Sequence, residues 1–278
     1  MTEDTRCRLC DGSTRLHFTA VVLEKYDCDY LLCEACGSLQ SERPYWLEEA
    51  YDRGGISDAD TGMFLRGINN LAIIYVVSRI ARLPARARVL DFGGGSGLLC
   101  RMLRDVGFDA RVSDRYARNE IAQGFDDLGE TPDLMCSFEV AEHFPEPRAG
   151  MTSILGRNAP ICLVGTELYH GQGKDWGYIG PQTGQHVFFY SHAAMKIMAD
   201  QHEYVYERVG SMHFFLKRPL GKWRSSILWR SMQPGVLRWV RAYLGLRISS
   251  RFAEADNLTA RLASAARVEA AGGRASRA

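Results

Sequence analysis

The feature that most constrains this 278-residue chain is a run of glycines between an apolar strand and a helix. Residues 88–92 read RVLDF, a short buried-strand pattern, and residues 98–106 carry apolar side chains at helical spacing. Between them stands D-x-G-x-G-x-G, from Asp91 to Gly97. Alternating glycines let a backbone turn and approach a ligand, because no side chain stands in the way. The run therefore predicts a strand–loop–helix unit that binds a ligand through its backbone.

Two common phosphate-binding loops do not fit this run. The dinucleotide fingerprint G-x-G-x-x-G, started at Gly93 and Gly95, needs a glycine where Leu98 stands. The chain also contains no G-x-x-x-x-G-K-[ST] run. Nicotinamide dinucleotides and P-loop nucleotides are therefore not the expected ligands.

Two acidic residues at the ends of neighbouring predicted strands indicate which ligand is expected instead. Asp91 offers a negative charge to an ammonium group, and the start of the following helix offers N–H groups to a carboxylate. Asp114 ends the predicted strand 109–113, where acidic residues accept ribose hydroxyls. An amino acid head joined to ribose and adenine is S-adenosylmethionine. The predicted cofactor-binding residues are Asp91, Gly93, Gly95, Gly97 and Asp114; the alternative is a turn that binds nothing.

The rest of the central region alternates strands and helices. Strands are predicted at 133–138, 160–165, 204–209 and 213–217, and helices at 148–157 and 192–202. This alternation predicts an α/β fold with a doubly wound, Rossmann-like sheet. The short connection between the last two strands predicts a hairpin, so the last strand should be antiparallel. Few residues separate Asp114 from Asp133, so a second helix and a third strand should be cut short.

Four cysteines near the N-terminus form two C-x2-C pairs, and they are Cys7, Cys10, Cys33 and Cys36. In a chain whose thiols stay reduced, such pairs are typical of a tetrahedral zinc site. All four ligands are thiolates, so no position is left for water and the zinc should be structural. Short ribbon strands are expected at 16–22 and 30–32, and Cys28 is expected to be a bystander.

Two motifs resemble those of class I S-adenosylmethionine-dependent methyltransferases. Residues 89–97, VLDFGGGSG, resemble the first motif of that family. Residues 137–147, SFEVAEHFPEP, resemble the motif after the fourth strand in the branch that acts on small molecules. A zinc-ribbon head before such a domain resembles bacterial methyltransferases that often modify sugars or surface glycans. The resemblance, over about residues 60–217, implies O- or C-methylation of a small-molecule or glycan acceptor.

The resemblance also implies further cofactor contacts. It places Phe138 and Glu139 near the cofactor. In the shortened stretch after Asp114, the adenine contact falls to Phe125, Asp126 or Asp127, and Phe125 is able to stack on the base.

Two histidines are the predicted catalytic residues. Methyl transfer is an in-line displacement that depends on alignment, with a base if the acceptor is a hydroxyl. His143 follows the predicted strand 133–138 at the sheet edge where ligands bind, and its alternative role is to cap the next turn. His186 is the rival base, in a long glycine-rich loop between 166 and 191. In that loop Trp176 and Tyr178 are suited to an acceptor ring, or simply cover the sheet edge.

The C-terminal stretch differs from the rest of the chain in charge. Residues 1–214 hold 21 Lys and Arg against 30 Asp and Glu, whereas residues 215–278 hold 13 against 3. Trp, Leu and Arg interleave between 217 and 246, which predicts basic amphipathic helices. These helices are expected to dock on the domain, or else to contact an anionic membrane surface, nucleic acid or a partner.

The predicted order of domains is a zinc-ribbon-like module at 1–45, a linking helical segment at 46–87, the cofactor-binding domain at 88–217 and a helical extension at 218–278. A helix is expected from 61 to 83. No signal-peptide pattern and no uncharged apolar run of about 18 residues is seen, so a cytoplasmic location is expected, with membrane association as the alternative.

Two other functions are compatible with this organisation. A zinc ribbon also precedes RNA base methyltransferase domains. Against this function, residues 1–214 are acidic, and the ribbon lacks the Lys/Arg patch expected at an RNA surface. The other alternative is a non-enzymatic protein whose ribbon binds a partner and whose cofactor site is a relic.

Overall fold

The computed structural model describes residues 6–52, 62–248 and 252–263. The chain divides into two compact units. The first, here called the ribbon unit, consists of Met1–Met63 and Ser137–Pro219. The second, the glycine-loop unit, consists of Phe64–Cys136 and Leu220–Ala278. Both units are therefore assembled from two stretches of chain, and the division falls within strand β6 (Leu134–Phe138).

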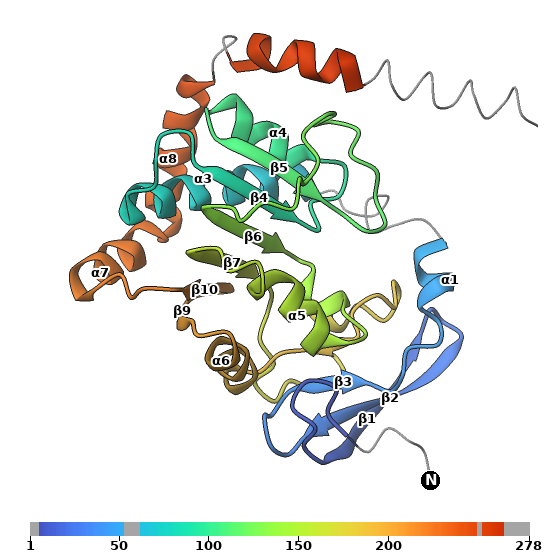
Figure 1. Cartoon of the computed structure of the whole chain (residues 1–278). Helices are drawn as coiled ribbons and strands as arrows, with labels where there is room; N and C mark the ends of the chain where they lie inside the picture. Colours follow the sequence, from blue (N-terminus) through green and yellow to red (C-terminus); the bar gives the residue numbers. More distant parts are fainter. Residues whose placement is uncertain (1–5, 53–61, 249–251, 264–278) are drawn as a thin grey trace, which may run out of the picture. The chain divides into compact units, whose positions relative to one another are not determined.

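The glycine-loop unit is built on three parallel strands in the order β5-β4-β6 (Figure 1). β4 (Arg88–Phe92) pairs with β5 (Asp109–Ser113) on one side and with β6 on the other. Helix α4 (Leu98–Asp105) connects β4 to β5. Val89, Leu90 and Asp91 are all buried, as expected for a parallel strand covered on both faces.

Helix α3 (Met63–Ala81) precedes this sheet and corresponds to the helix expected at 61–83. By length and composition alone it is apolar enough to cross a membrane. Buried core helices pass the same test, and the middle of α3 buries Leu71, Ile74 and Val77. At the start of the helix, Phe64 and Leu65 are exposed.

The connection between β5 and β6 is short and irregular, as the sequence predicts. Between 114 and 133 the structure has neither a helix nor a strand, only an isolated bridge from Val112 to Asp126. Asn119 organises this stretch, since its amide both donates to the carbonyl of Ala122 and accepts from the N–H of Ala122.

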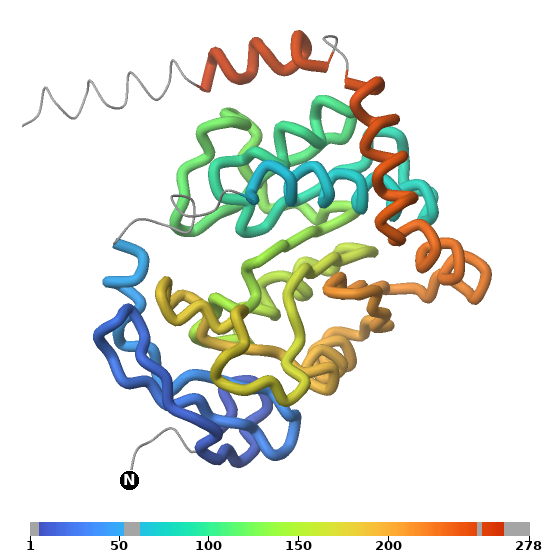
Figure 2. The backbone as a smooth tube through the Cα atoms, turned by 180° about the vertical axis from the view of Figure 1, so that it is seen from behind, coloured from blue at the N-terminus to red at the C-terminus, as the bar shows by residue number. Residues whose placement is uncertain are grey.

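The C-terminal extension packs on its own unit. It contains α7 (Lys222–Ser231), α8 (Pro234–Arg247) and a helical stretch over 252–263. Figure 2 shows α8, in red-orange, beside α3, in cyan. The rings of Tyr75 on α3 and Tyr243 on α8 lie 6.0 Å apart, and Arg241 donates to Asn69.

The ribbon unit contains an antiparallel four-stranded sheet in the order β1-β2-β3-β8. Its strands are β1 (Thr14–Val22), β2 (Tyr26–Cys33), β3 (Leu39–Ser41) and β8 (Phe188–Phe189). β8 lies in the segment predicted to be a loop throughout, and that prediction is wrong at this point. Both phenylalanines are fully buried and supply the partner that the edge of β3 needs.

The same unit contains the last three strands of the α/β pattern. β7 (Ile161–Gly165) pairs antiparallel with β10 (Met212–Leu216), which in turn pairs antiparallel with β9 (Val205–Val209). The predicted Rossmann-like α/β fold with an antiparallel last strand is thus confirmed. The remaining helices of the unit are α1 (Leu47–Asp52), η1 (Ala141–His143), α5 (Pro147–Leu155), η2 (Gly177–Ile179) and α6 (His192–Gln201).

Candidate functional site

The glycine loop after β4 needs its glycines for two different physical reasons. Gly93, Gly95 and Gly97 have φ of 73°, 57° and 88°, values that other residues rarely adopt. Gly94 has an ordinary φ, but a Cβ there would lie 2.3 Å from Oδ2 of Asp91. Gly94 is therefore a fourth constrained glycine, which the alternating pattern did not reveal.

Gly95 lies at an open part of the loop. A Cβ built on Gly95 meets no atom within 4 Å, whereas one on Gly97 would lie 2.6 Å from Oδ1 of Asn119. The backbone at Gly95 is thus accessible to a ligand.

Asp91 is the most unusual side chain of the glycine-loop unit. It is 3% exposed, and within the described part of the chain its Oδ2 has no hydrogen-bond partner. The pKa of Asp91 is raised to about 7, mainly by burial and also by the negative charge of Asp114, while a hydrogen bond from Cys136 lowers it. A buried carboxylate oxygen of this kind is costly unless a donor meets it.

Asp114 is turned toward the same loop. Its Oδ2 accepts a hydrogen bond from the N–H of Gly95 at 2.9 Å, and its Oδ1 accepts from Tyr116 and Ala117 at 2.8 and 2.7 Å. The structure therefore brings the five residues predicted from the sequence into one loop region. A ligand with an ammonium group and hydroxyl donors fits these carboxylates.

Phe125 is buried, whereas stacking on a cofactor base requires an accessible ring face. It is 5% exposed, and the guanidinium of Arg104 lies 3.6 Å from the ring centroid, so one face is already covered. Asp126 accepts a hydrogen bond from Asn119. Burial and the Arg104 contact make Phe125 first of all a core residue.

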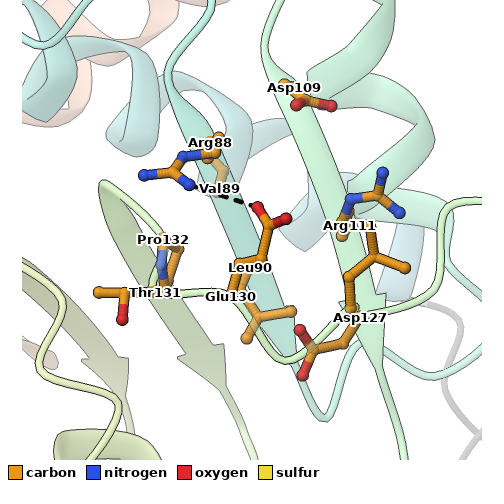
Figure 3. Close-up of a pocket in the computed structure, with 10 residues that line it drawn as sticks. Arg88, Val89, Leu90, Asp109, Arg111, Asp127, Glu130, Thr131 and Pro132 are labelled. Atoms are coloured by element: carbon orange, nitrogen blue, oxygen red, sulfur yellow. Dashed lines mark hydrogen bonds and ion pairs between the residues drawn. The ribbon is translucent and has the colours of Figure 1, made fainter.

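A hollow elsewhere in this unit carries no comparable chemistry. Figure 3 shows it at the first residues of β4 and β5, where Arg88 reaches Glu130 at 3.3 Å. Its volume is about 20 Å³, room for little more than one water molecule. Because ligands of parallel sheets bind beyond the carboxyl ends of the strands, this hollow is not the expected site.

The ribbon unit brings the two predicted catalytic histidines together. The rings of His143 and His186 lie 4.8 Å apart at 89°. The pKa of His143 is lowered to about 3 by burial and by the neighbouring His186, and burial also lowers the pKa of His186. Both imidazoles are therefore neutral at pH 7. A pKa of about 3 is far from the value at which a general base works best.

Glu142 and Tyr178 complete this cluster; Glu142 was not a predicted site residue, and Tyr178 was expected only as a ring that contacts the acceptor. The hydroxyl of Tyr178 donates to Oε1 of Glu142 at 2.5 Å and lies 3.1 Å from Oγ1 of Thr166. Nδ1 of His186 lies 2.5 Å from the carbonyl of Tyr178, which can only accept, so Nδ1 donates. The adjacent Glu142 and His143 were the only signal of this cluster in the sequence. No local pattern could show that Tyr178 bonds to both Glu142 and His186.

Phe138 and Glu139 are the remaining predicted cofactor contacts; Phe138 ends β6 and Glu139 follows it, both in the ribbon unit. The N–H of Glu139 donates to the carbonyl of Gly165 at 2.8 Å. A Cβ on Gly165 would lie 2.7 Å from Phe138, so a glycine is needed there. Glu139 has a φ of 55°, which is uncommon outside glycine and often marks a functional position.

The aromatic residues of the long segment pack mainly on one another. Trp176 lies 5.3 Å from Tyr178 and 5.4 Å from Phe189, and it packs against the core formed with Tyr30 and Trp46. This packing favours the structural alternative for Trp176. The polar end of Tyr178, by contrast, belongs to the histidine cluster.

The four predicted zinc ligands converge at one end of the ribbon. Sγ of Cys7 lies 3.7 Å from Sγ of Cys36, and Sγ of Cys10 lies 3.5 Å from Sγ of Cys33. Thiolates 2.3 Å from a tetrahedral zinc ion are about 3.7 Å apart, so the sulfur positions fit zinc. Cys28 is fully buried outside the cluster, as expected for a bystander.

Comparisons with known proteins give a family and several similar folds. A family described as a methyltransferase domain matches residues 67–208. A search of curated proteins gives no match. CalO1, a methyltransferase in calicheamicin biosynthesis solved in the SAH-bound form, is 15% identical with a TM-score of 0.37, over 52% of this chain and 54% of that chain.

Two further solved structures show similar values. An O-methyltransferase family protein from Burkholderia thailandensis is 14% identical with a TM-score of 0.39, over 50% of this chain and 53% of that chain. The magnesium protoporphyrin IX methyltransferase ChlM from Synechocystis PCC 6803, with bound SAH, is 16% identical with a TM-score of 0.39, over 62% of this chain and 95% of that chain. The chain thus matches about half the length of CalO1 and of the Burkholderia protein.

The family match includes the glycine loop, Asp114 and both predicted histidines. It covers just over half of the 278 residues. The chain therefore belongs to the methyltransferase domain family, as its two motifs predicted.

Proposed function

We propose that this protein is an S-adenosylmethionine-dependent methyltransferase that modifies a hydroxyl group of a small-molecule acceptor, and that the acceptor is a sugar or glycan. The observation that carries the proposal is the buried Oδ2 of Asp91, which meets no hydrogen-bond donor among the described residues and lies against Gly94 of the glycine loop. A loop that binds nothing has no reason to keep such a carboxylate, because its burial costs stability.

The residues of the glycine loop fit the cofactor group by group. Asp91 meets the ammonium group, the N–H groups at the start of α4 face the carboxylate, and Asp114 accepts from the ribose hydroxyls. When bound, S-adenosylmethionine supplies a methyl group on a sulfonium sulfur and a neutral thioether as leaving group. The chain has only to bind, align and exclude water, apart from handling the acceptor proton.

We assign activation of the acceptor hydroxyl to the histidine cluster of the ribbon unit. His143 and His186 are neutral, and Glu142 and Tyr178 add polar groups beside them. The sugar class rests on the resemblance of the ribbon-plus-domain arrangement to enzymes that modify sugars. Structural zinc at the four cysteines is part of the same proposal.

Calorimetric titration with S-adenosylhomocysteine tests the cofactor half of this proposal. Binding in the micromolar range is expected, and no heat at millimolar ligand would overturn the proposal. The acceptor half is tested by incubating the protein with S-adenosylmethionine and a panel of nucleotide-linked sugars while S-adenosylhomocysteine release is measured. If the protein binds the cofactor but releases no S-adenosylhomocysteine with any sugar, the sugar acceptor is contradicted and the cofactor assignment is not.

An RNA acceptor is the rival that needs a separate measurement. Residues 1–214 carry an excess of acidic groups, which opposes phosphate binding. A salt-sensitive mobility shift with RNA would favour that rival over a sugar acceptor.

We further propose that the basic extension places the protein on an anionic membrane. Trp223, Trp229 and Trp239 on α7 and α8 are 70%, 58% and 72% exposed and alternate with arginines. Flotation of the full chain with anionic vesicles tests this. Loss of flotation in a Trp223→Ala, Trp239→Ala variant is expected. Equal flotation of both proteins would exclude a role of these tryptophans, and a wild type that does not float would exclude the membrane contact.

A further inference from the structure

Three potential metal ligands outside the cysteine site converge in the ribbon unit. Glu142 and His143 come from η1, and His186 precedes β8. One ligand atom from each lies within 4.8 Å of the others. Two ligands at 2.0–2.1 Å from a tetrahedral ion are about 3.4 Å apart, so small side-chain rotations close this group around an ion.

The carboxylate of Glu142 gives an independent reason to expect a cation. The residue is fully buried, and Oε1 accepts from the hydroxyl of Tyr178. In the part of the chain that the structure describes, Oε2 has no hydrogen-bond partner. A buried oxygen with no donor is costly, and a cation would satisfy it.

The surroundings of His186 are those of a metal-ligating histidine. Its Nδ1–H donates to the carbonyl of Tyr178, which leaves the lone pair of Nε2 available. Metal ligands of this type usually donate their other ring N–H to a carbonyl or carboxylate, which fixes the tautomer and the ring orientation. Tyr178 therefore positions two ligands, Glu142 through its hydroxyl and His186 through its carbonyl.

We propose that Glu142, His143 and His186 form a second divalent-cation site, of the kind that binds Zn²⁺, with Tyr178 as its positioning residue. Two imidazoles and one carboxylate are a ligand set of catalytic zinc sites, which leave a fourth position open. The four-cysteine site, in contrast, has no open position.

The open position suggests a role that rests on the proposed function. A hydroxyl bound there would become more acidic, as water does on such an ion. The two histidines would then act as ligands and not as bases.

Metal content of the full-length protein tests the site without any activity assay. After loading with Zn²⁺ and desalting, the wild type is expected to hold two zinc ions per chain by mass spectrometry. Glu142→Gln and His186→Ala should each hold one, and so should Cys33→Ser. His170→Ala is the matched control, since His170 is an exposed histidine of the same segment, and it should hold two.

Substitution with Co²⁺ distinguishes the two sites by their spectra. Cys33→Ser should retain a cobalt spectrum without thiolate charge transfer, and His186→Ala should retain only the thiolate bands. Tyr178→Phe should weaken binding at the second site by about 10- to 100-fold, as loss of an outer contact does. Circular dichroism and a thermal melt establish whether each variant is folded. If the other variants do not fold, the zinc content of Glu142→Gln decides the test, because this substitution is nearly isosteric.

One zinc ion per wild-type chain, or two in both Glu142→Gln and His186→Ala, would overturn the proposal. Calorimetry with S-adenosylhomocysteine on the same samples keeps the two proposals apart. Cofactor binding with a single zinc ion would reject the second metal site and leave the proposed methyl transfer intact.

Discussion

At the scale of single residues, Asp91 shows how a functional group is kept at the expense of stability. Its carboxylate is buried beside Asp114, and its pKa is raised to about 7 from 3.8. A raised pKa means that the stability contribution is present below pH 3.8 and is lost as the pH rises through about 7. The complete loss corresponds to about 4 kcal/mol.

The Asp91→Asn variant should therefore be more stable than the wild type at pH 8 and should lose cofactor binding. Urea unfolding at pH 5 and pH 8, with and without S-adenosylhomocysteine, measures both effects. The wild type should lose stability between these pH values and regain it with ligand. The stability of Asp91→Asn should change neither with pH over this range nor with ligand. If its stability depends on pH as that of the wild type does, the carboxylate of Asp91 is not the cause of the pH dependence.

At the scale of elements, the glycine loop can be tested with a matched pair of substitutions. Gly95→Ala places a methyl group in the open part of the loop, and Gly129→Ala places one in open space elsewhere. Both positions have positive φ, 57° and 81°, so each substitution should cost about 1–2 kcal/mol. Only Gly95→Ala should weaken S-adenosylhomocysteine binding, by about tenfold or more. Equal affinities in calorimetry would argue against a cofactor at this loop.

The helix over 252–263 contributes one member of a buried ion-pair network. Asp256 lies 2.7 Å from Arg104 and 2.9 Å from Arg101, and both Asp256 and Arg104 are almost completely buried. Removing one partner of a buried pair costs about 3–5 kcal/mol. Asp256→Asn should thus lower the melting temperature and expose the C-terminal helix to protease. Glu254→Gln, at an exposed position of the same helix, is the control and should change stability by less than about 0.5 kcal/mol.

At the scale of the whole molecule, the zinc ion that we propose at the cysteine cluster should determine whether the ribbon unit folds. The ribbon sheet shares an aromatic core with the 166–191 segment, in which Tyr30, Trp46 and Phe189 are nearly fully buried. Displacing zinc with a mercurial and a chelator should unfold this core, since structural zinc supplies folding free energy. Tryptophan fluorescence should shift to the red and recover when zinc is restored.

Cys28 provides the control for this experiment. Cys28→Ala removes a buried thiol that is not a predicted ligand and should keep the thiolate-bound zinc, whereas Cys33→Ser should release it. A fluorescence spectrum unaffected by complete zinc removal would show that the ribbon core does not need the metal.

Local sequence patterns were sufficient for most of the fold. The elements around the glycine run, the antiparallel β10 and the irregular stretch after Asp114 depend on residue periodicity and turn chemistry over a few positions. β8 was missed because only two residues form it, and its partner β3 is far away in sequence. The domain boundaries predicted along the chain remain predictions. Each of the two compact units combines stretches that are far apart in the sequence, which a division along the chain does not describe.

The amino-acid sequence was enough to predict the family, the glycine loop with Asp91 and Asp114, and the convergence of four cysteines. In each case the chemistry depends on residues that are close together or at a fixed spacing. The folded chain was needed to show that Gly94 is constrained, that Arg104 covers Phe125, and that Tyr178 bonds to Glu142 and His186. Those relations depend on side chains brought together from distant segments. They also depend on burial, which shifts pKa values and separates oxygens from water, and burial exists only after the chain has folded.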